Sequence, residues 1–277
     1  MEDFHIACGQ FAPEPGEKDK NTARMIRYAG EARDLRCDLI LFPELIVTGY
    51  IAAEKIPPLA EPLDGPHVRQ LSKAARDLGI AIAFGLAEKD AERDVCYNSL
   101  VALNAQGEIA GVYRKMHLWA SEKEWAQGGD QVETFSIGGV TCGGWICYDT
   151  RFPEVARLAA LRGADLGLVA TAWLGPAEEW ALSLRARALD NAIFVAGADI
   201  ISYDPMLRCY GHSMIVDPHG QVLAQAEPEE AGIIHAELEA EVLEAQRARV
   251  PLLADRHPEL YRELHTLEPD PEGDAVA

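Results

Sequence analysis

Glu44 is the first of three residues in this chain whose type and position could do chemistry. It follows the apolar run Leu39-Ile-Leu-Phe-Pro43, which is short enough to be a buried strand. A carboxylate held at such a strand end should be desolvated, which raises its pKa and suits it to proton transfer near neutral pH. The alternative is a helix-capping or ion-paired glutamate, and the position alone favours neither reading.

Lys115 is the second candidate, and it ends a strand in Val112-Tyr-Arg-Lys-Met-His117. The alternation of a strand places Lys115 and His117 on one face and Arg114 on the other. An ammonium close to a reacting carbonyl supplies positive charge where an oxyanion forms. Taken alone, an exposed basic strand end is the commoner outcome for such an Arg-Lys pair.

Cys147 is the third candidate, and it lies where a strand turns sharply toward a helix, in Thr141-Cys-Gly-Gly-Trp-Ile-Cys-Tyr-Asp-Thr-Arg-Phe-Pro153. Nucleophiles of other hydrolases occupy this strand–turn–helix position, where the side chain emerges at the end of the sheet. A helix just beyond the turn and a nearby lysine would favour the thiolate over the thiol. The alternative is a buried last residue of the strand, a role that Cys142 fits better.

The elements that must position these residues alternate between strand-like and helix-like patterns, which favours an α/β layered domain. Strands are expected over 4–12, 39–42, 80–86, 140–146, 166–170, 192–199 and 231–237, and helices over 19–36, 66–79, 153–162, 176–191 and 239–248. Two hairpins are expected, with turns at 104–107 and 217–220. We predict one domain over residues 1–267 and an acidic, mobile tail over residues 268–277.

The composition excludes several classes of partner. The chain has 25 basic and 45 acidic residues and a net charge of −20, so its surface should repel nucleic acid and anionic membranes. Its apolar runs are far shorter than the ~20 residues of a bilayer span, and its N-terminus does not read as a secretory signal. We therefore expect a cytoplasmic protein with a small-molecule substrate and neither a nucleic-acid nor a membrane partner.

The cysteines do not indicate a metal or disulfide protein. They stand at positions 8, 37, 96, 142, 147 and 209, without a Cys-x-x-Cys pair or a histidine at zinc-site spacing. Most should be small buried residues. We expect no metal and no organic cofactor.

The three candidates together resemble one family more than any of them does alone. Phe-Pro-Glu44-Leu, then Tyr-Arg-Lys115-Met-His-Leu-Trp, then Trp-Ile-Cys147-Tyr-Asp-Thr-Arg-Phe-Pro-Glu resemble the nitrilase superfamily of carbon–nitrogen hydrolases, from the first strand to about residue 265. Glu122 stands where family members commonly place a second active-site glutamate. Ala126 and Gly128 depart from the aromatic residue and the proline often found there.

This resemblance implies a four-layer α-β-β-α sandwich, assembled into a homodimer or a larger homo-oligomer. It implies an enzyme of the amidase branches, which include the ω-amidases, with Cys147 as nucleophile, Glu44 as proton carrier and Lys115 as oxyanion stabiliser. The backbone N–H of Tyr148 should be a further oxyanion donor, and Glu122 should orient Lys115 or the amide. His117 could serve as a base, but we expect a structural hydrogen-bonding role for it.

The substrate pocket is less well defined by the sequence. Arg151 could bind a substrate carboxylate or could only pair with Asp149 or Glu154. Trp173, Tyr50 and Trp119 are candidates for the pocket wall. Three readings of function stay open: hydrolysis of a small amide, the same site used by an acyltransferase or an N-carbamoyl amidohydrolase, and a non-catalytic scaffold, against which the complete Glu-Lys-Cys set speaks.

Overall fold

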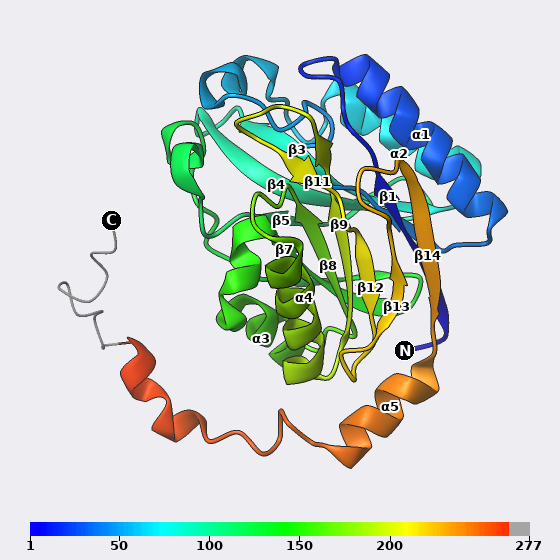
Figure 1. The fold of residues 1–277 in the computed structure, drawn as a ribbon, viewed down its shortest axis with the longest axis vertical. Coiled ribbons are helices and arrows are strands. Elements are labelled where there is room, and N and C mark those ends of the chain that lie inside the picture. Colours follow the sequence, from blue (N-terminus) through cyan, green and yellow to red (C-terminus); the bar gives the residue numbers. More distant parts are fainter. Residues whose placement is uncertain (266–277) are drawn as a thin grey trace.

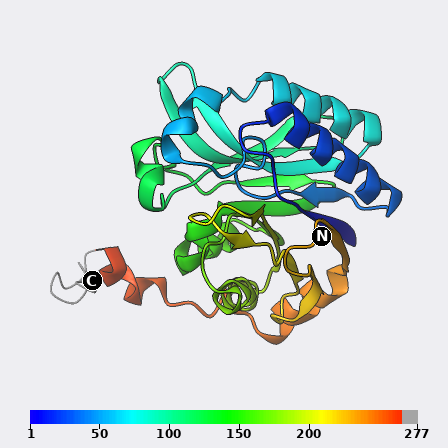
Figure 2. The same ribbon diagram turned by 45° about the horizontal axis from the view of Figure 1, so that its top comes forward.

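Residues 1–265 of the computed structural model form two six-stranded sheets that face each other, with helices over both outer faces (Figures 1 and 2). Figure 2 shows the first sheet and its helices above the second sheet and its helices. The predicted α/β class and the α-β-β-α sandwich are therefore confirmed. The tail predicted over 268–277 lies outside the described residues, and the single domain over 1–267 stays a prediction.

The first sheet carries the strand that leads to Glu44, and its strand order is β14-β1-β2-β3-β4-β5. Its strands are β1 (Phe4–Gln10), β2 (Leu39–Leu41), β3 (Ala81–Asp90), β4 (Val95–Leu103), β5 (Ile109–Arg114) and β14 (Gly232–Leu238). Helices α1 (Lys18–Asp34) and α2 (Pro66–Leu78) cover its outer face. Because β1, β2 and β3 are parallel, residues that follow their carboxyl ends lie at one edge of the sheet.

The second sheet carries the strand that leads to Cys147, in the order β13-β12-β9-β8-β7-β6. Its strands are β6 (Thr134–Ile137), β7 (Val140–Ile146), β8 (Leu166–Thr171), β9 (Phe194–Asp199), β12 (Met214–Val216) and β13 (Val222–Gln225). Helices α3 (Pro153–Leu161) and α4 (Ala177–Asn191) cover its outer face. The central strands β7, β8 and β9 are parallel, so their carboxyl ends also share one edge.

The remaining elements lie around the sandwich. A two-stranded ribbon joins β10 (Ile201–Ser202) to β11 (Cys209–Tyr210), and α5 (Ala240–Arg249) follows β14. Beyond α5 the chain extends along the side of the second sheet up to residue 265 (Figure 1), and Leu253 packs against the core. Among the described residues, no helix combines the length and the apolar character that crossing a bilayer requires.

Turn residues end the elements where the sequence predicted. Gly79 follows α2 with a φ of +68°, a left-handed conformation that glycine adopts without strain. The hairpin between β4 and β5 turns at Gly107, whose N–H donates to the Asn104 carbonyl. The hairpin between β12 and β13 turns at Gly220, which bonds Asp217 in the same way. Both predicted hairpins are therefore confirmed, whereas the short strands β6, β10 and β11 were not predicted.

Gly85 in β3 lets the segment that carries Glu44 lie directly against the sheet. A Cβ atom at this position would stand 2.4 Å from the Leu45 nitrogen and 2.6 Å from the Glu44 Cα. The Gly85 N–H also donates to the Pro43 carbonyl over 3.1 Å. Neither contact is with a flexible side chain, so only glycine fits without moving the backbone at Glu44.

We expect the Gly85→Ala variant to lose about 1–3 kcal/mol of unfolding free energy, because an added methyl group overpacks a rigid backbone contact. Urea denaturation of the variant and the parent protein measures this difference. Gly30→Ala is the matched control, since Gly30 lies in α1 with no atom within 4 Å of the added Cβ. The control should gain about 0.5–1 kcal/mol. A Gly85→Ala protein as stable as the parent would contradict the close approach.

Candidate active site

Glu44 is fully buried at the edge where the first sheet faces the second. Its Oε1 accepts hydrogen bonds from Lys115 Nζ and from Asn98 Nδ2, each over 2.7 Å. Its Oε2 accepts the backbone N–H of Ala172 over 2.9 Å, and Ala172 directly follows β8 of the second sheet. The Glu44 carboxylate thus joins the two sheets.

Lys115 follows the last residue of β5 and is also fully buried. Its ammonium lies 2.7 Å from Glu44 and 2.8 Å from Glu122. Glu122 belongs to the short helix η3 (Ala120–Glu124) and accepts hydrogen bonds from the backbone N–H of Trp119 and the hydroxyl of Tyr50. One buried cation therefore lies between two buried carboxylates.

Burial and charge act in opposite directions on these groups. Burial raises the pKa of Glu44 to about 7, with Lys115 opposing the rise and Glu122 adding to it. Burial alone would lower the pKa of Lys115, but Glu44 and Glu122 hold it well above its ordinary range. The lysine is therefore a fixed positive charge, whereas Glu44 can take up and release a proton near neutral pH, as the sequence predicted.

Cys147 follows the last residue of β7, at the same edge as Glu44 and Lys115. It has a φ of +45°, a strained left-handed conformation that costs a residue other than glycine of order 1–3 kcal/mol. Its Sγ lies 3.6 Å from the Ala172 carbonyl, and the N–H of the same residue donates to Glu44. Ala172 thus contacts both groups. Its carbonyl oxygen lies near the Cys147 sulfur, and its N–H binds the Glu44 carboxylate.

The sharp turn at Cys147 is held by Asp149, for which the sequence suggested only a pairing with Arg151. Its Oδ2 accepts the Ile146 N–H over 3.1 Å and the Tyr113 hydroxyl over 2.8 Å. Its Oδ1 lies 2.8 Å from Nδ1 of His117 and accepts the His117 N–H over 2.9 Å. Asp149 is fully buried, so these four contacts replace the water it gives up.

The geometry of His117 matches a structural role. Its ring is stacked on Phe152 at 3.6 Å between centroids and with an interplanar angle of 5°. Its Nδ1 is occupied by the Asp149 carboxylate. The expectation that Lys115 and His117 lie on one face of a strand is wrong, because β5 ends at Arg114 and neither residue belongs to it.

The expectation that a nearby helix and lysine would favour the thiolate of Cys147 over its thiol is not met. Burial raises the pKa of its thiol above the ordinary range, and the negative charge of Glu44 raises it further. Lys115 lowers it, but not enough to compensate. The α-helix that was expected to help begins only at Pro153, after the short helix η4 (Cys147–Arg151), so its amino end does not lie at the sulfur.

A cavity of about 320 Å³ opens at Cys147. Of the residues predicted to bind substrate, Trp119, Tyr148, Arg151 and Trp173 line it. Trp119 and Tyr148 meet edge to face with ring centroids 4.7 Å apart. The structure therefore brings these four predicted residues together around the cavity at Cys147.

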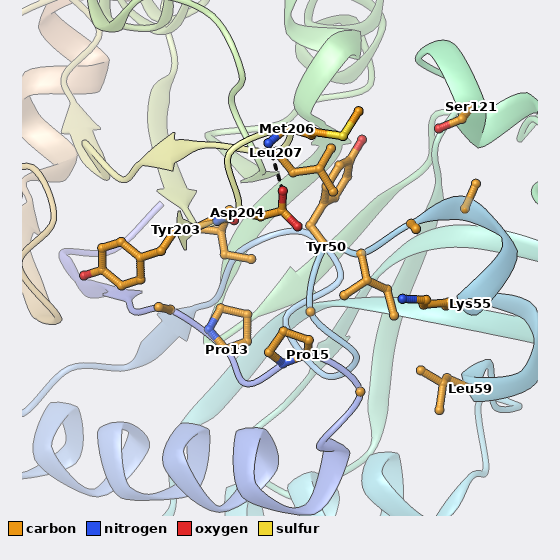
Figure 3. A pocket seen from close by; sticks show the side chains of 18 of the residues that line it. Pro13, Pro15, Tyr50, Lys55, Leu59, Ser121, Tyr203, Asp204, Met206 and Leu207 are labelled. Atoms are coloured by element: carbon orange, nitrogen blue, oxygen red, sulfur yellow. Dashed lines mark hydrogen bonds between the residues drawn. The ribbon is translucent and has the colours of Figure 1, made fainter.

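Tyr50 lines a second and larger cavity of about 710 Å³, which Figure 3 shows from close by. The wall of this cavity is largely apolar and includes Pro13, Pro15, Leu59 and Leu207. The Tyr50 hydroxyl donates to Glu122 Oε1 over 3.3 Å. Tyr50 thus touches the buried charge cluster from this second cavity, and it does not line the cavity at Cys147.

Arg151 has a partner that the sequence did not suggest. Its guanidinium pairs with Glu179 of α4, and its Cζ lies 4.8 Å from the centroid of the Trp173 ring. The pairing with Asp149 or Glu154 that we considered is not the one present, because η4 directs Arg151 toward α4. Both side chains of the pair are nearly half exposed, so the pair lies at the cavity mouth.

Two further residues that sequence reasoning missed support the site. Asn98 donates to Glu44 and also to Glu122, the latter over 3.3 Å, and its buried place in an apolar strand was an available signal. Asp199 accepts the N–H groups of Trp173 and Ile200, each over 2.9 Å. Burial raises its pKa well above the ordinary range.

The chain is similar to known proteins over most of its length. Residues 5–248 match the family model of the carbon-nitrogen hydrolases. The 2-oxoglutaramate amidase of Bacillus subtilis is 33% identical over 92% of this chain and 98% of its own length. An (R)-stereoselective amidase of Pseudomonas sp. is 35% identical over 94% of this chain and 97% of its own length.

The fold gives the same result. The structure of Nit3 from Saccharomyces cerevisiae, described as a member of branch 10 of the nitrilase superfamily, superposes with a TM-score of 0.84 at 30% identity. The match covers 91% of this chain and 95% of that one. The resemblance seen in the sequence motifs is therefore confirmed: the chain belongs to the carbon-nitrogen hydrolase family, within the nitrilase superfamily.

Proposed function

We propose that this enzyme hydrolyses a small linear amide to a carboxylic acid and ammonia, with Cys147 as nucleophile. The supporting observation is the convergence of Cys147, Glu44 and Lys115, each at a strand end, on one edge of the two facing sheets beside a cavity. The chemistry needs a nucleophile, a group that carries protons and a positive charge for the carbonyl oxygen. Each of these roles has one buried candidate here.

In the first half-reaction the Cys147 sulfur attacks the carbonyl carbon while its proton passes to Glu44. The raised pKa of the thiol makes this transfer necessary, and the pKa of Glu44 near 7 makes it possible at neutral pH. Lys115 and the Tyr148 N–H hold the oxyanion. Glu44 then returns its proton to the departing nitrogen, ammonia leaves, and a thioester remains on Cys147.

In the second half-reaction water attacks the thioester carbonyl and gives a proton to Glu44. The carbon–sulfur bond breaks, the acid is released, and the sulfur regains its proton from Glu44. Glu122 has a positioning role, because it fixes the Lys115 ammonium from the side opposite Glu44. The reaction in this form uses only side chains and the backbone of this chain.

For the substrate we propose a primary amide of modest size, since the cavity at Cys147 holds about 320 Å³ and has aromatic walls. The 2-oxoglutaramate amidase among the relatives is named for an amide that also bears a carboxylate. Arg151 is the cation at the mouth of this cavity that such a group would meet. Its pairing with Glu179 reduces the positive charge that it presents to substrate.

We also retain the predicted homo-oligomer as part of this proposal. Helices α3 and α4 present exposed apolar side chains on the outside of the second sheet, namely Leu158, Leu161, Leu182 and Leu189. We propose that a second copy of the chain covers these side chains, since exposed apolar surface often marks a protein–protein contact.

The Cys147→Ala variant should lose at least about 10⁴-fold in kcat for ammonia release from its best amide, because no other group can form the thioester. A screen of primary amides, ω-amides and N-carbamoyl compounds with ammonia detection identifies that substrate. Cys142→Ala in the same strand is the matched control and should keep its activity. Comparable activity in both variants would exclude Cys147 as nucleophile.

The acid limb of kcat/KM should lie near pH 7, because Glu44 must be ionised to accept the thiol proton and its pKa is about 7. Below that pH, kcat/KM should fall about tenfold per unit as the carboxyl group becomes protonated. Initial rates from pH 5 to 9 measure the profile. A limb near pH 4.5, where an exposed glutamate titrates, would contradict the role assigned to Glu44.

Arg151 and Glu179 should control selection for a substrate carboxylate. Arg151→Ala should raise KM for an ω-amide of a dicarboxylic acid by about 10-fold or more, through loss of a charged hydrogen bond, and leave kcat nearly unchanged. Glu179→Gln should lower that KM because it frees the guanidinium. The methyl ester of the same amide is the uncharged control and should respond to neither change. An unchanged KM in Arg151→Ala would remove Arg151 from the substrate site.

A further inference from the structure

His5, Cys37 and His235 meet at the edge of the first sheet that lies opposite the proposed active site. His5 is in β1 and His235 is in β14, and Cys37 is in the turn between α1 and β2. In the parallel pairing Ile6 lies beside Leu39, so His5 is level with the start of β2. Glu44 follows the other end of β2, which separates the two places by the length of the strand.

One ligand atom from each of the three side chains lies within 4.8 Å of the other two. Nε2 of His5 and Nδ1 of His235 are 2.9 Å apart, so one ring nitrogen is protonated and the other accepts. Cys37 is buried and His235 is exposed, which leaves the cluster open to solvent on one side. The sequence predicted no metal site because these ligands are distant along the chain.

The surroundings favour a cation. Asp38 accepts the backbone N–H of His5 over 2.8 Å, and Glu237 faces His5 across the β1–β14 pair on the same side of the sheet. The carbonyl end of α1 is close, since the Cys37 N–H donates to the Ala32 carbonyl over 3.0 Å. Carboxylates and the end of a helix both lower the energy of a bound cation.

We propose that His5, Cys37 and His235 form a zinc site that fastens strand β14 to the turn before β2. Two imidazole nitrogens and one sulfur are ligands that Zn²⁺ prefers, with a water molecule from the open side completing four-coordination. Zinc bonds of 2.0–2.1 Å to nitrogen and 2.3 Å to sulfur require ligand atoms about 3.3–3.6 Å apart. The two rings therefore separate by a few tenths of an ångström.

Binding of one Zn²⁺ ion releases one proton. Zn²⁺ replaces the proton of the Cys37 thiol and takes the place of the hydrogen bond between the imidazoles. Each imidazole stays neutral, with its remaining proton on the nitrogen that does not bind metal. Since β14 is the edge strand of its sheet, the ion links an edge to two interior segments and should oppose fraying there.

Titration of the metal-free protein with Co²⁺ tests the site, because a cobalt–thiolate bond gives a charge-transfer absorption in the near ultraviolet. We expect one Co²⁺ per chain with this absorption, and its displacement by Zn²⁺. Zinc at about 100 times its Kd should raise the thermal unfolding midpoint by roughly 5 °C. Cys37→Ser and His235→Gln should each weaken binding at least about tenfold.

The controls separate this site from the active site. His235 is exposed, so His235→Gln should fold even where Cys37→Ser does not. Cys147→Ala should keep the cobalt absorption, and His219→Gln, in the turn before β13, should bind like the parent protein. Absence of the charge-transfer absorption, or binding that neither Cys37→Ser nor His235→Gln weakens, would overturn the proposal. Neither outcome bears on amide hydrolysis.

Discussion

The structure of the candidate site depends on one buried interaction, the ammonium of Lys115 held between the carboxylates of Glu44 and Glu122. An unpaired ionised group in this environment would cost several kcal/mol, so each of the three is stable only because the others are present. The Lys115 ammonium has a more defined position than the ammonium of a solvent-exposed lysine, because it has a carboxylate partner on each side. Asn98 donates to both carboxylates and thereby fixes their spacing.

This cluster also determines the protonation of the nucleophile. Cys147 lies in a buried environment near a negative carboxylate, which favours its neutral thiol. The same desolvation brings the pKa of Glu44 to about 7, so the carboxylate is a competent base at neutral pH. Burial thus keeps Cys147 as a thiol in the resting enzyme, and it also makes Glu44 a base that can remove the thiol proton. The strained backbone at Cys147, held by Asp149, keeps the sulfur at the cavity while this exchange occurs.

Local sequence patterns identified the positions of three candidate residues, and only the combination of their motifs with the family resemblance assigned them to one site. Glu44, Lys115 and Cys147 each follow a strand, and an apolar run that ends in a polar residue is visible in the sequence. The partner of Arg151 was not predictable, because Glu179 reaches it only through the packing of α4 against η4. The expectation that the thiolate of Cys147 would be favoured was not met for a similar reason, since burial is a property of the whole sandwich. The sandwich topology itself came from family resemblance, because strand order does not follow from periodicity.

The central claim is that sulfur, carboxylate and ammonium act on a single carbonyl group. A crystal structure of the Cys147→Ala protein with its best amide bound tests this claim most directly. The account predicts the amide in the cavity at residue 147, with its carbonyl oxygen about 2.7–3.2 Å from the Lys115 ammonium and its nitrogen beside Glu44. An amide bound with its carbonyl group directed away from Lys115, or in the larger cavity beside Tyr50, would contradict it.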